Sequence, residues 1–184
     1  ILAGRLADQT GASVLEVNLS CPNIGDEGLV CYNLDVTEQI TKGIRENIGD
    51  KPLILKVGYY RSDADLERLA EIAEESADSV SGINTLQAEV RNAQGEQALP
   101  GPNRLRSGVC GIGIKWAGLD FVRRLHAIRE RRGFTFSIEG VGGVLSPEDY
   151  KEYRDAGADV VMSATGAMWN PYLAKEIKEA YPDA

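Results

Sequence analysis

Short apolar runs alternate with longer amphipathic stretches along this chain of 184 residues, and this alternation is the feature that most limits its fold. Strand-like runs fall at residues 14–19, 53–57, 79–84, 134–139 and 159–164, and helical patterns fall at about 34–48, 63–76, 117–131, 147–156 and 170–180. Strands that alternate with helices are typical of parallel sheets. The sequence therefore predicts an α/β fold in one domain, built either as a doubly wound sheet or as a (β/α) barrel.

Local signals mark two helix starts and one insertion. Ser62 is followed three positions later by Asp65, and Ser146 stands directly before Pro147. Both arrangements favour the first turn of a helix. Residues 86–113 show no regular pattern. A loop of that length within an α/β domain is usually a binding lid or an inserted hairpin.

Composition disfavours several classes of function. The formal charge of −8 argues against a nucleic-acid partner. No apolar run reaches the roughly 18 residues of a membrane span, and the first residues show no secretory signal. The three cysteines form no CxxC pair, which favours a reducing, cytoplasmic setting. His126 is the single histidine, so neither a metal site nor a Ser-His-Asp triad is predicted. The helical pattern around His126 places this residue at a helix edge.

The first predicted strand ends in polar residues. Strand alternation puts Glu16, Asn18 and Ser20 on one face and Val17 and Leu19 on the other. An unpaired buried polar group costs about 1–3 kcal/mol, so this face needs either a hydrogen-bonded network or a ligand. Ligands in barrels and in open α/β sheets bind at the carboxyl ends of the strands.

Two reactive side chains stand at or just after the carboxyl ends of their predicted strands. Cys21 precedes Pro22, where the chain leaves regular structure, and an exposed thiol there can act as a base or nucleophile. Lys56 lies near the end of a strongly apolar strand, where an anionic ligand would satisfy its charge. Cys31 and Cys110 are interpreted as small buried apolar side chains.

Glycine-rich segments follow the last two predicted strands. Residues 140–144 read Gly-Val-Gly-Gly-Val, and residues 164–166 read Ala-Thr-Gly. Small residues expose backbone amides, which can hold a phosphate group. Two such segments after consecutive βα units are typical of the phosphate site of a (β/α)8 barrel.

The segment Asn18-Leu19-Ser20-Cys21-Pro22-Asn23 resembles the N-x-S-C-P-N motif of the dihydroorotate dehydrogenases, flavoenzymes of pyrimidine biosynthesis. The resemblance continues in order through Lys56, residues 83–85, residues 108–111, Gly142-Gly143 and Ala164-Thr165, and covers nearly the whole chain. It implies a TIM (β/α)8 barrel that binds FMN. The chain would contain only about the last five βα units, as a partial barrel over residues 1–184, because the family's early strands have no counterpart here and a whole barrel needs roughly 250 residues.

The resemblance also implies roles for individual residues. Cys21, the base of class 1-like enzymes, would remove a proton from C5 of dihydroorotate while hydride passes from C6 to flavin N5. The pyrimidine substrate would be held by Asn18, Asn23, Asn84 and Thr85. FMN would be bound by Asn18, Lys56, Ile83, Gly111, Gly142, Gly143, Ala164 and Thr165, with Lys56 near the N1–C2 edge of the flavin. The implied partner is a second copy of the chain or an electron-transfer subunit, and the electron acceptor stays open.

Three alternatives remain open at this level. Thr85 and the loop after Cys21 are also similar to the pyrimidine half of dihydropyrimidine dehydrogenase, a reductase of uracil and thymine, although Asn23 favours dihydroorotate. The chain could also be a non-catalytic fragment that binds flavin or phosphate, or a TIM-barrel lyase with Lys56 as Schiff base. Glu139, which interrupts an apolar strand, has no explanation in the sequence.

Overall fold

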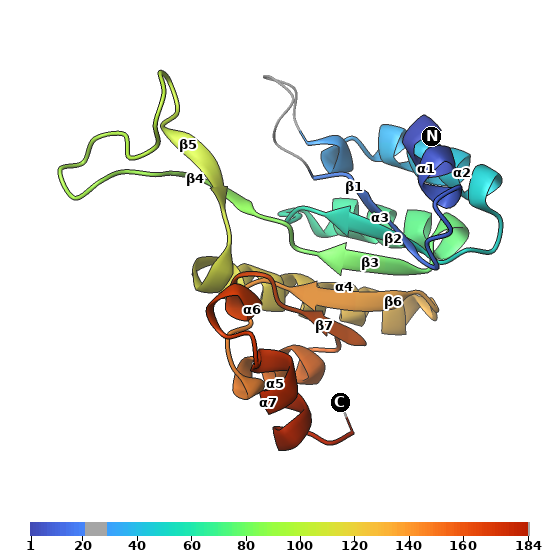
Figure 1. The fold of residues 1–184 in the computed structure, drawn as a ribbon. Helices are drawn as coiled ribbons and strands as arrows, with labels where there is room; N and C mark the ends of the chain where they lie inside the picture. Colours follow the sequence, from blue (N-terminus) through green and yellow to red (C-terminus); the bar gives the residue numbers. More distant parts are fainter. Residues whose placement is uncertain (21–28, 184) are drawn as a thin grey trace.

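A computed structural model describes residues 1–20 and 29–183. Its centre is a five-stranded sheet in the order β1-β2-β3-β6-β7, in which every neighbouring pair is parallel (Figure 1). The strands are β1 (Leu15–Asn18), β2 (Leu53–Val57), β3 (Ser79–Gly82), β6 (Ser137–Val141) and β7 (Val160–Met162). Consecutive strands are spatial neighbours, which is the order of a (β/α) barrel and not of a doubly wound sheet. The described chain therefore forms about five of the eight βα units.

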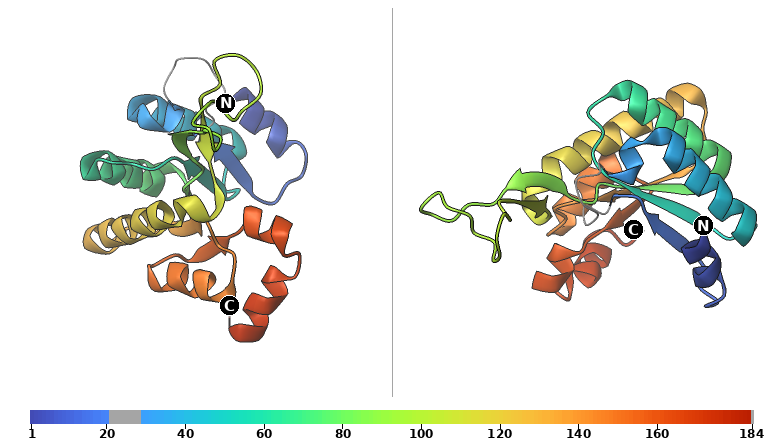
Figure 2. Two further views of the ribbon diagram at one scale, coloured as in Figure 1. Left: turned by 90° about the vertical axis from the view of Figure 1, so that its left-hand side faces the viewer. Right: turned by 90° about the horizontal axis from the view of Figure 1, so that it is seen from above.

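Helices cover one face of this sheet. The two views of Figure 2 show α2, α3 and α4 following one another along that face, each between the strands it connects. The helical elements are α1 (Leu2–Asp8), η1 (Val30–Tyr32), α2 (Leu34–Ile48), α3 (Asp63–Ser76), η2 (Gly111–Ile114), α4 (Lys115–Arg132), α5 (Pro147–Asp155), α6 (Thr165–Trp169) and α7 (Leu173–Ala180). None of the helices in the described part is long and apolar enough to cross a membrane.

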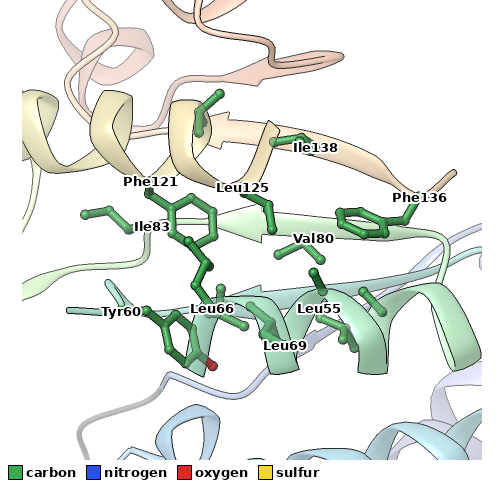
Figure 3. Close-up of a cluster of buried hydrophobic side chains, with 14 of the residues drawn as sticks. Leu55, Tyr60, Leu66, Leu69, Val80, Ile83, Phe121, Leu125, Phe136 and Ile138 are labelled. Carbon is green, nitrogen blue, oxygen red and sulfur yellow. The ribbon is translucent and has the colours of Figure 1, made fainter. Parts of the chain in front are cut away.

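The hydrophobic core lies between the sheet and these helices. Leu55, Val80 and Ile138 occupy one register row across three strands and are fully buried. They face apolar side chains of α3 and α4, including Leu69 and Phe121 (Figure 3). Gly82 leaves space for the Phe121 ring, since an added Cβ would lie 2.2 Å from one of its carbons. This packing fixes the positions of the strand ends.

The opposite face of the sheet is polar. One register row on this face places Lys56, Ser81 and Glu139 side by side, and the preceding row on the same face contains Glu16 and Ser79 on either side of Ile54. In a closed (β/α)8 barrel this face points inward, where branched apolar residues usually dominate. Here charged and hydroxyl groups occupy much of it, with Ile54 between Glu16 and Ser79.

The irregular stretch after β3 is a hairpin. Strands β4 (Leu86–Glu89) and β5 (Arg106–Val109) pair antiparallel and extend away from the parallel sheet (Figure 1). The predicted insertion is thus confirmed as a hairpin. Two helix starts are confirmed as well: the Ser62 side chain accepts from the Asp65 amide, and Ser146 and Asp149 form a reciprocal capping box.

Several element bounds differ from the expectation. The fourth strand of the parallel sheet begins at Ser137, because Glu74 of α3 accepts hydrogen bonds from the amides of Thr135 and Phe136. It then continues to Val141, which pairs with Met162. Helix α6 lies where only a glycine-rich loop was predicted, and the last helix begins at Leu173.

Two arginine–aspartate pairs fix strand starts: Arg45 of α2 pairs with Asp78 just before β3, and Arg129 of α4 pairs with Asp159 just before β7. Asp78 accepts from Arg45 and from the Leu53 amide, and Asp159 accepts from Arg129 and, at 2.8 Å, from the Ile138 amide. Both pairs lie at the amino ends of the strands. This end of a barrel usually carries stability and not catalysis.

Replacing Asp159 by asparagine should lower the free energy of unfolding of the intact protein by about 1–2 kcal/mol at pH 7, since hydrogen bonds to charged groups are the stronger ones. Burial opposes ionisation of Asp159, but the Arg129 guanidinium and the Ile138 amide outweigh it and hold the pKa of its carboxyl below the usual value. The contribution of the ionised Asp159 carboxylate to the free energy of unfolding is complete above the unfolded-state pKa of about 3.9. It is lost as pH falls through the lower folded-state pKa.

Urea denaturation of wild type and Asp159→Asn at pH 7, and at stepwise lower pH, checks this. The difference between the two proteins should shrink below about pH 4. Asp155→Asn is the matched control, because Asp155 pairs with Lys151 on an exposed helix surface and such pairs contribute about 0.5 kcal/mol or less. Equal destabilisation by both variants would contradict the role of Asp159.

Candidate active site

The candidate site lies at the carboxyl ends of the parallel strands, where the predicted functional residues of the described chain come together. Asn18 and Lys56 are direct register partners at the ends of β1 and β2. Asn84 follows β3 and is tied back to the sheet by its amide, which donates to the carbonyl of Val57 at 2.9 Å. The loops that follow β6 and β7 begin at the same edge of the sheet.

Asn18, Ser20 and Asn84 form a hydrogen-bonded chain across this edge. The Asn18 Oδ1 atom accepts from both the backbone amide and the hydroxyl of Ser20 at 3.1 Å. Asn84 Nδ2 donates to the Ser20 carbonyl at 3.0 Å. Within the described part of the chain, Asn18 Nδ2 and Asn84 Oδ1 make no hydrogen bond, so one donor and one acceptor are available to a ligand. The polar face of β1 is thus partly an internal network and partly open.

Lys56 has a charged neighbour on the polar face of the sheet. Its Nζ lies 3.8 Å from Oε1 of Glu16, beyond hydrogen-bond length but within ion-pair range. The side chains of Lys56 and Glu16 are 21% and 35% exposed, so the pair is only partly solvated. The lysine is therefore held loosely enough to interact with a second anionic group.

Glu139, unexplained by the sequence, lies on the same face. It is 7% exposed and its Oε1 is 3.0 Å from the Ser79 hydroxyl. Burial, and to a smaller extent the charge of Glu16, raise the pKa of its carboxyl, while Ser79 and Lys56 act in the opposite direction. Glu139 therefore belongs to a polar cluster inside the barrel face and is not a disruption of the strand.

Three loops converge to form a glycine-lined cradle. A Cβ added to Gly143 would lie 3.0 Å from the Gly111 carbonyl oxygen, and one added to Gly111 would lie 3.5 Å from the Thr165 side chain. Gly111 and Gly143 have φ values of 73° and 72°, a region that glycine adopts without steric cost. The segments of Gly111 and Gly143 can approach this closely only because side chains are missing, and the Thr165 side chain lies in van der Waals range of Gly111. The arrangement suits an oxygen-rich anionic group held by amides.

Tyr153 supports the cradle from the core. Its hydroxyl donates to the Gly142 carbonyl at 2.7 Å, and its ring is fully buried. The side chain fits because Gly118 and Gly140 offer no Cβ: an atom added at Gly118 would lie 2.0 Å from the Tyr153 hydroxyl oxygen, and one added at Gly140 would lie 2.4 Å from a ring carbon. Burial raises the pKa of the Tyr153 hydroxyl, so it remains a neutral donor at physiological pH. Nothing in the sequence pattern singled out this residue.

The remaining predicted residues are placed as follows. Ile83 is fully buried in the core, so its side chain cannot line a ligand site and only its backbone could do so (Figure 3). Thr85 packs against Gly108 at the base of the hairpin, where an added Cβ would lie 2.5 Å from its hydroxyl. Ala164 directly precedes α6, next to Thr165. Cys21 and Asn23 lie outside the described residues.

The interpretation of the other two cysteines is half right. Cys31 is fully buried and accepts a hydrogen bond from the Gly58 amide, as expected for a structural cysteine. Cys110 is exposed, with its sulfur 3.7 Å from the Thr165 hydroxyl. The expectation of a buried Cys110 is wrong, because Cys110 follows the last residue of the hairpin and directly precedes Gly111 of the cradle. His126 lies at the edge of α4, with its ring 3.3 Å from Arg129, as predicted.

The site combines neutral hydrogen-bonding groups, one ammonium group and an amide-rich cradle. Side-chain amides recognise planar groups that carry both donors and acceptors, and the cradle suits a phosphate. Among the described residues, no group of three or more His, Cys, Asp or Glu side chains could hold a metal ion. The arrangement therefore suits a planar heterocycle next to a phosphorylated cofactor.

Comparisons with known proteins agree with this geometry. The chain is 39% identical to the dihydroorotate dehydrogenase of Dictyostelium discoideum over 92% of the chain and 47% of that protein. It is 33% identical to the catalytic subunit of dihydroorotate dehydrogenase B (NAD(+)) of Maridesulfovibrio salexigens, over 98% of the chain and 57% of that subunit. The crystal structure of the Eimeria tenella enzyme in complex with ferulenol superimposes with a TM-score of 0.76 at 18% identity, covering 96% of this chain and 51% of that one.

The chain thus spans about half the length of the relatives it matches. The family model for dihydroorotate dehydrogenase matches residues 5–183, which is nearly all of the sequence. Both the parallel strand order and the convergence of the loops at the carboxyl edge are what that family's barrel requires. By sequence and by fold, the chain belongs to the dihydroorotate dehydrogenase family.

Proposed function

We propose that this chain supplies the cysteine base, part of the pyrimidine site and the phosphate cradle of an FMN-dependent enzyme that oxidises dihydroorotate to orotate. The observation that carries the proposal is the convergence of Gly111, Gly143 and Thr165 at the strand edge that also presents Asn18 and Lys56. One edge therefore offers both a cradle for a phosphate and hydrogen-bonding groups for a planar ring.

The residues present fit FMN. An alanine methyl at Gly143 would clash with Lys115 and the Gly111 carbonyl, so the close approach of these loops depends on glycine at that position. Gly111, Gly142, Gly143, Ala164 and Thr165 would hold the phosphate, mainly through their amides. Ile83 would contribute its backbone.

FMN, when bound, accepts the hydride that leaves the substrate. Lys56 would place its ammonium group near the pyrimidine edge of the flavin, because it stands at the end of β2 on the polar face. Its contact with Glu16, at 3.8 Å, leaves it free to interact with a further acceptor.

Dihydroorotate would be held by Asn18, Asn23, Asn84 and Thr85. The described asparagines suit a ring that carries both N–H and C=O groups, because Asn18 offers a free Nδ2 donor and Asn84 a free Oδ1 acceptor within the described part of the chain. Their mutual link through Ser20 keeps them at a fixed separation. This preorganisation lowers the entropic cost of binding.

Cys21 would remove the proton from C5 of the substrate. A thiol suits this step when its pKa lies near the working pH. With cysteine in this position the enzyme would be of the class 1-like type, cytoplasmic, and not linked to membrane quinones. Residues 1–184 would then be the FMN-binding part of one barrel. The partner would be a second copy of the protein or an electron-transfer subunit, and the relative named as a catalytic subunit supports the latter.

Anaerobic reduction of the purified intact protein tests the proposal. The protein should be yellow with bound FMN, and dihydroorotate should bleach the flavin absorbance while dihydrouracil should not. Bleaching by dihydrouracil alone would support the dihydropyrimidine dehydrogenase alternative. If FMN is bound but neither compound reduces it, the protein binds flavin without catalysis and the proposed activity is rejected. Borohydride trapping of an adduct on Lys56 would instead indicate Schiff-base chemistry.

A further inference from the structure

The polar face of the sheet contains a cluster of five side chains that the proposed function does not fully use: Glu16, Lys56, Ser79, Ser81 and Glu139. They come from four adjacent strands and point to the same side. Two carboxyl groups share this face with a single ammonium group. How the charges are distributed within the cluster decides how much positive charge Lys56 presents at the strand edge.

The register shows which carboxyl group is the counter-ion of Lys56. Glu139 stands in the same row but two strands away, and neighbouring strands are about 4.8 Å apart. Ser81 lies between them, and its hydroxyl cannot carry a charge. Glu16, on the adjacent strand, reaches to 3.8 Å from Lys56 Nζ. Glu16 is therefore the carboxylate that pairs with the lysine.

The contacts of Ser79 leave a charged Glu139 poorly satisfied. The Ser79 oxygen lies 3.1 Å from the Ser137 carbonyl and 3.0 Å from Oε1 of Glu139. Ser79 has one hydroxyl hydrogen, and a carbonyl can only accept. The single hydrogen is therefore shared between the Ser137 carbonyl and Glu139, and Ser79 gives a charged Glu139 at most part of one hydrogen bond.

The surroundings of Glu139 agree with a neutral acid. The residue is 7% exposed, and burial of an unpaired carboxylate is strongly unfavourable. The neighbouring Ser81 hydroxyl is buried and has no hydrogen-bond partner within the described residues, so it does not donate to Glu139. The cluster thus contains one cation, one anion and one neutral acid.

We infer that Glu16 is a positioning residue that tunes the flavin through Lys56, while Glu139 is kept neutral by its burial and takes no part in the charge balance. This inference rests on the proposed function, in which Lys56 lies near the flavin. A cation at that edge stabilises the negative charge of reduced FMN, and Glu16 partly cancels the cation. Removing the charge of Glu16 should therefore favour the reduced cofactor.

The test compares Glu16→Gln and Glu139→Gln in the intact protein loaded with FMN. Glu16→Gln should shift the midpoint potential to a more positive value, corresponding to a change on the order of tenfold in the ratio of affinities for reduced and oxidised FMN. Glu139→Gln should leave the potential unchanged, because glutamine resembles a neutral acid in shape and charge. Glu16→Asp keeps the negative charge, so its midpoint potential should stay close to that of wild type.

Glu130→Gln is the matched control, since Glu130 lies on α4 and its side chain is 66% exposed. A second readout is infrared spectroscopy at neutral pH: the carbonyl band of a protonated carboxyl group should be present in wild type and absent in Glu139→Gln. An unchanged potential in Glu16→Gln, or equal shifts in the two glutamine variants, would overturn the inference. A protein that binds no FMN would reject the proposed function itself, and with it the role of Glu16 toward the flavin.

Discussion

Gly143→Ala is expected to weaken FMN binding by the intact protein at least about 100-fold, which corresponds to roughly 2.7 kcal/mol. The added methyl group would lie 2.7 Å from Cβ of Lys115 and 3.0 Å from the Gly111 carbonyl oxygen, distances that force backbone apart. The new group also takes up the space in which the loops after β5 and β6 approach each other. Fluorescence titration of the apoprotein with FMN measures the change.

Gly133→Ala separates the loss of space from the strain of the backbone. Gly133 has a φ of 67°, close to that of Gly143, and an added Cβ at Gly133 would meet nothing within 4 Å. Both variants pay the cost of a left-handed alanine, about 1 kcal/mol, but only Gly143→Ala closes the cradle. Equal FMN affinity of the two variants would show that the cradle does not hold the phosphate.

Cys21→Ala is expected to slow the reduction of bound flavin by dihydroorotate about 10²- to 10⁴-fold at neutral pH, the usual contribution of a general base. Cys21 lies outside the described residues, but Ser20 before it is buried and is held by Asn18 and Asn84. The chain therefore leaves the strand at the amide network that we assign to the substrate. Anaerobic stopped-flow spectroscopy of the flavin absorbance measures the rate.

Cys21→Ser provides the informative comparison. A serine hydroxyl can still accept the proton but has a much higher pKa than a thiol, so its rate should rise more steeply with pH than that of wild type. All rates are compared at equal FMN content, since a loss of cofactor would imitate a loss of the base. An alanine variant that is reduced as fast as wild type at neutral pH would remove Cys21 from the mechanism.

The regular elements were predictable because their signals are local. The bounds of β2, α2 and α3 agree with the sequence to the residue, since each has a clear apolar period and a recognisable first turn. The start of β6 was not predictable in this way. Glu74, more than 60 positions earlier in the chain, takes the amides of Thr135 and Phe136 away from the sheet.

The candidate site was only partly predictable for the same reason. The motif around Asn18 and the glycine segments indicated residue types suited to a pyrimidine and a phosphate. The contact of Gly111 with Gly143, the support of Tyr153 and the exposure of Cys110 depend on loops from different βα units. No pattern within one segment contains that information.

By itself the sequence determined the alternation of strands and helices, the family resemblance and the chemical character of the strand ends, because periodicity, capping and motifs are properties of neighbouring residues. Only the tertiary structure decided which polar residues share a face. Parallel register brings Lys56, Ser81 and Glu139 into one row and turns Glu139 from an interruption of an apolar strand into a member of a buried cluster. Register is set by the packing of whole elements, and it therefore becomes visible only when the strands are placed side by side.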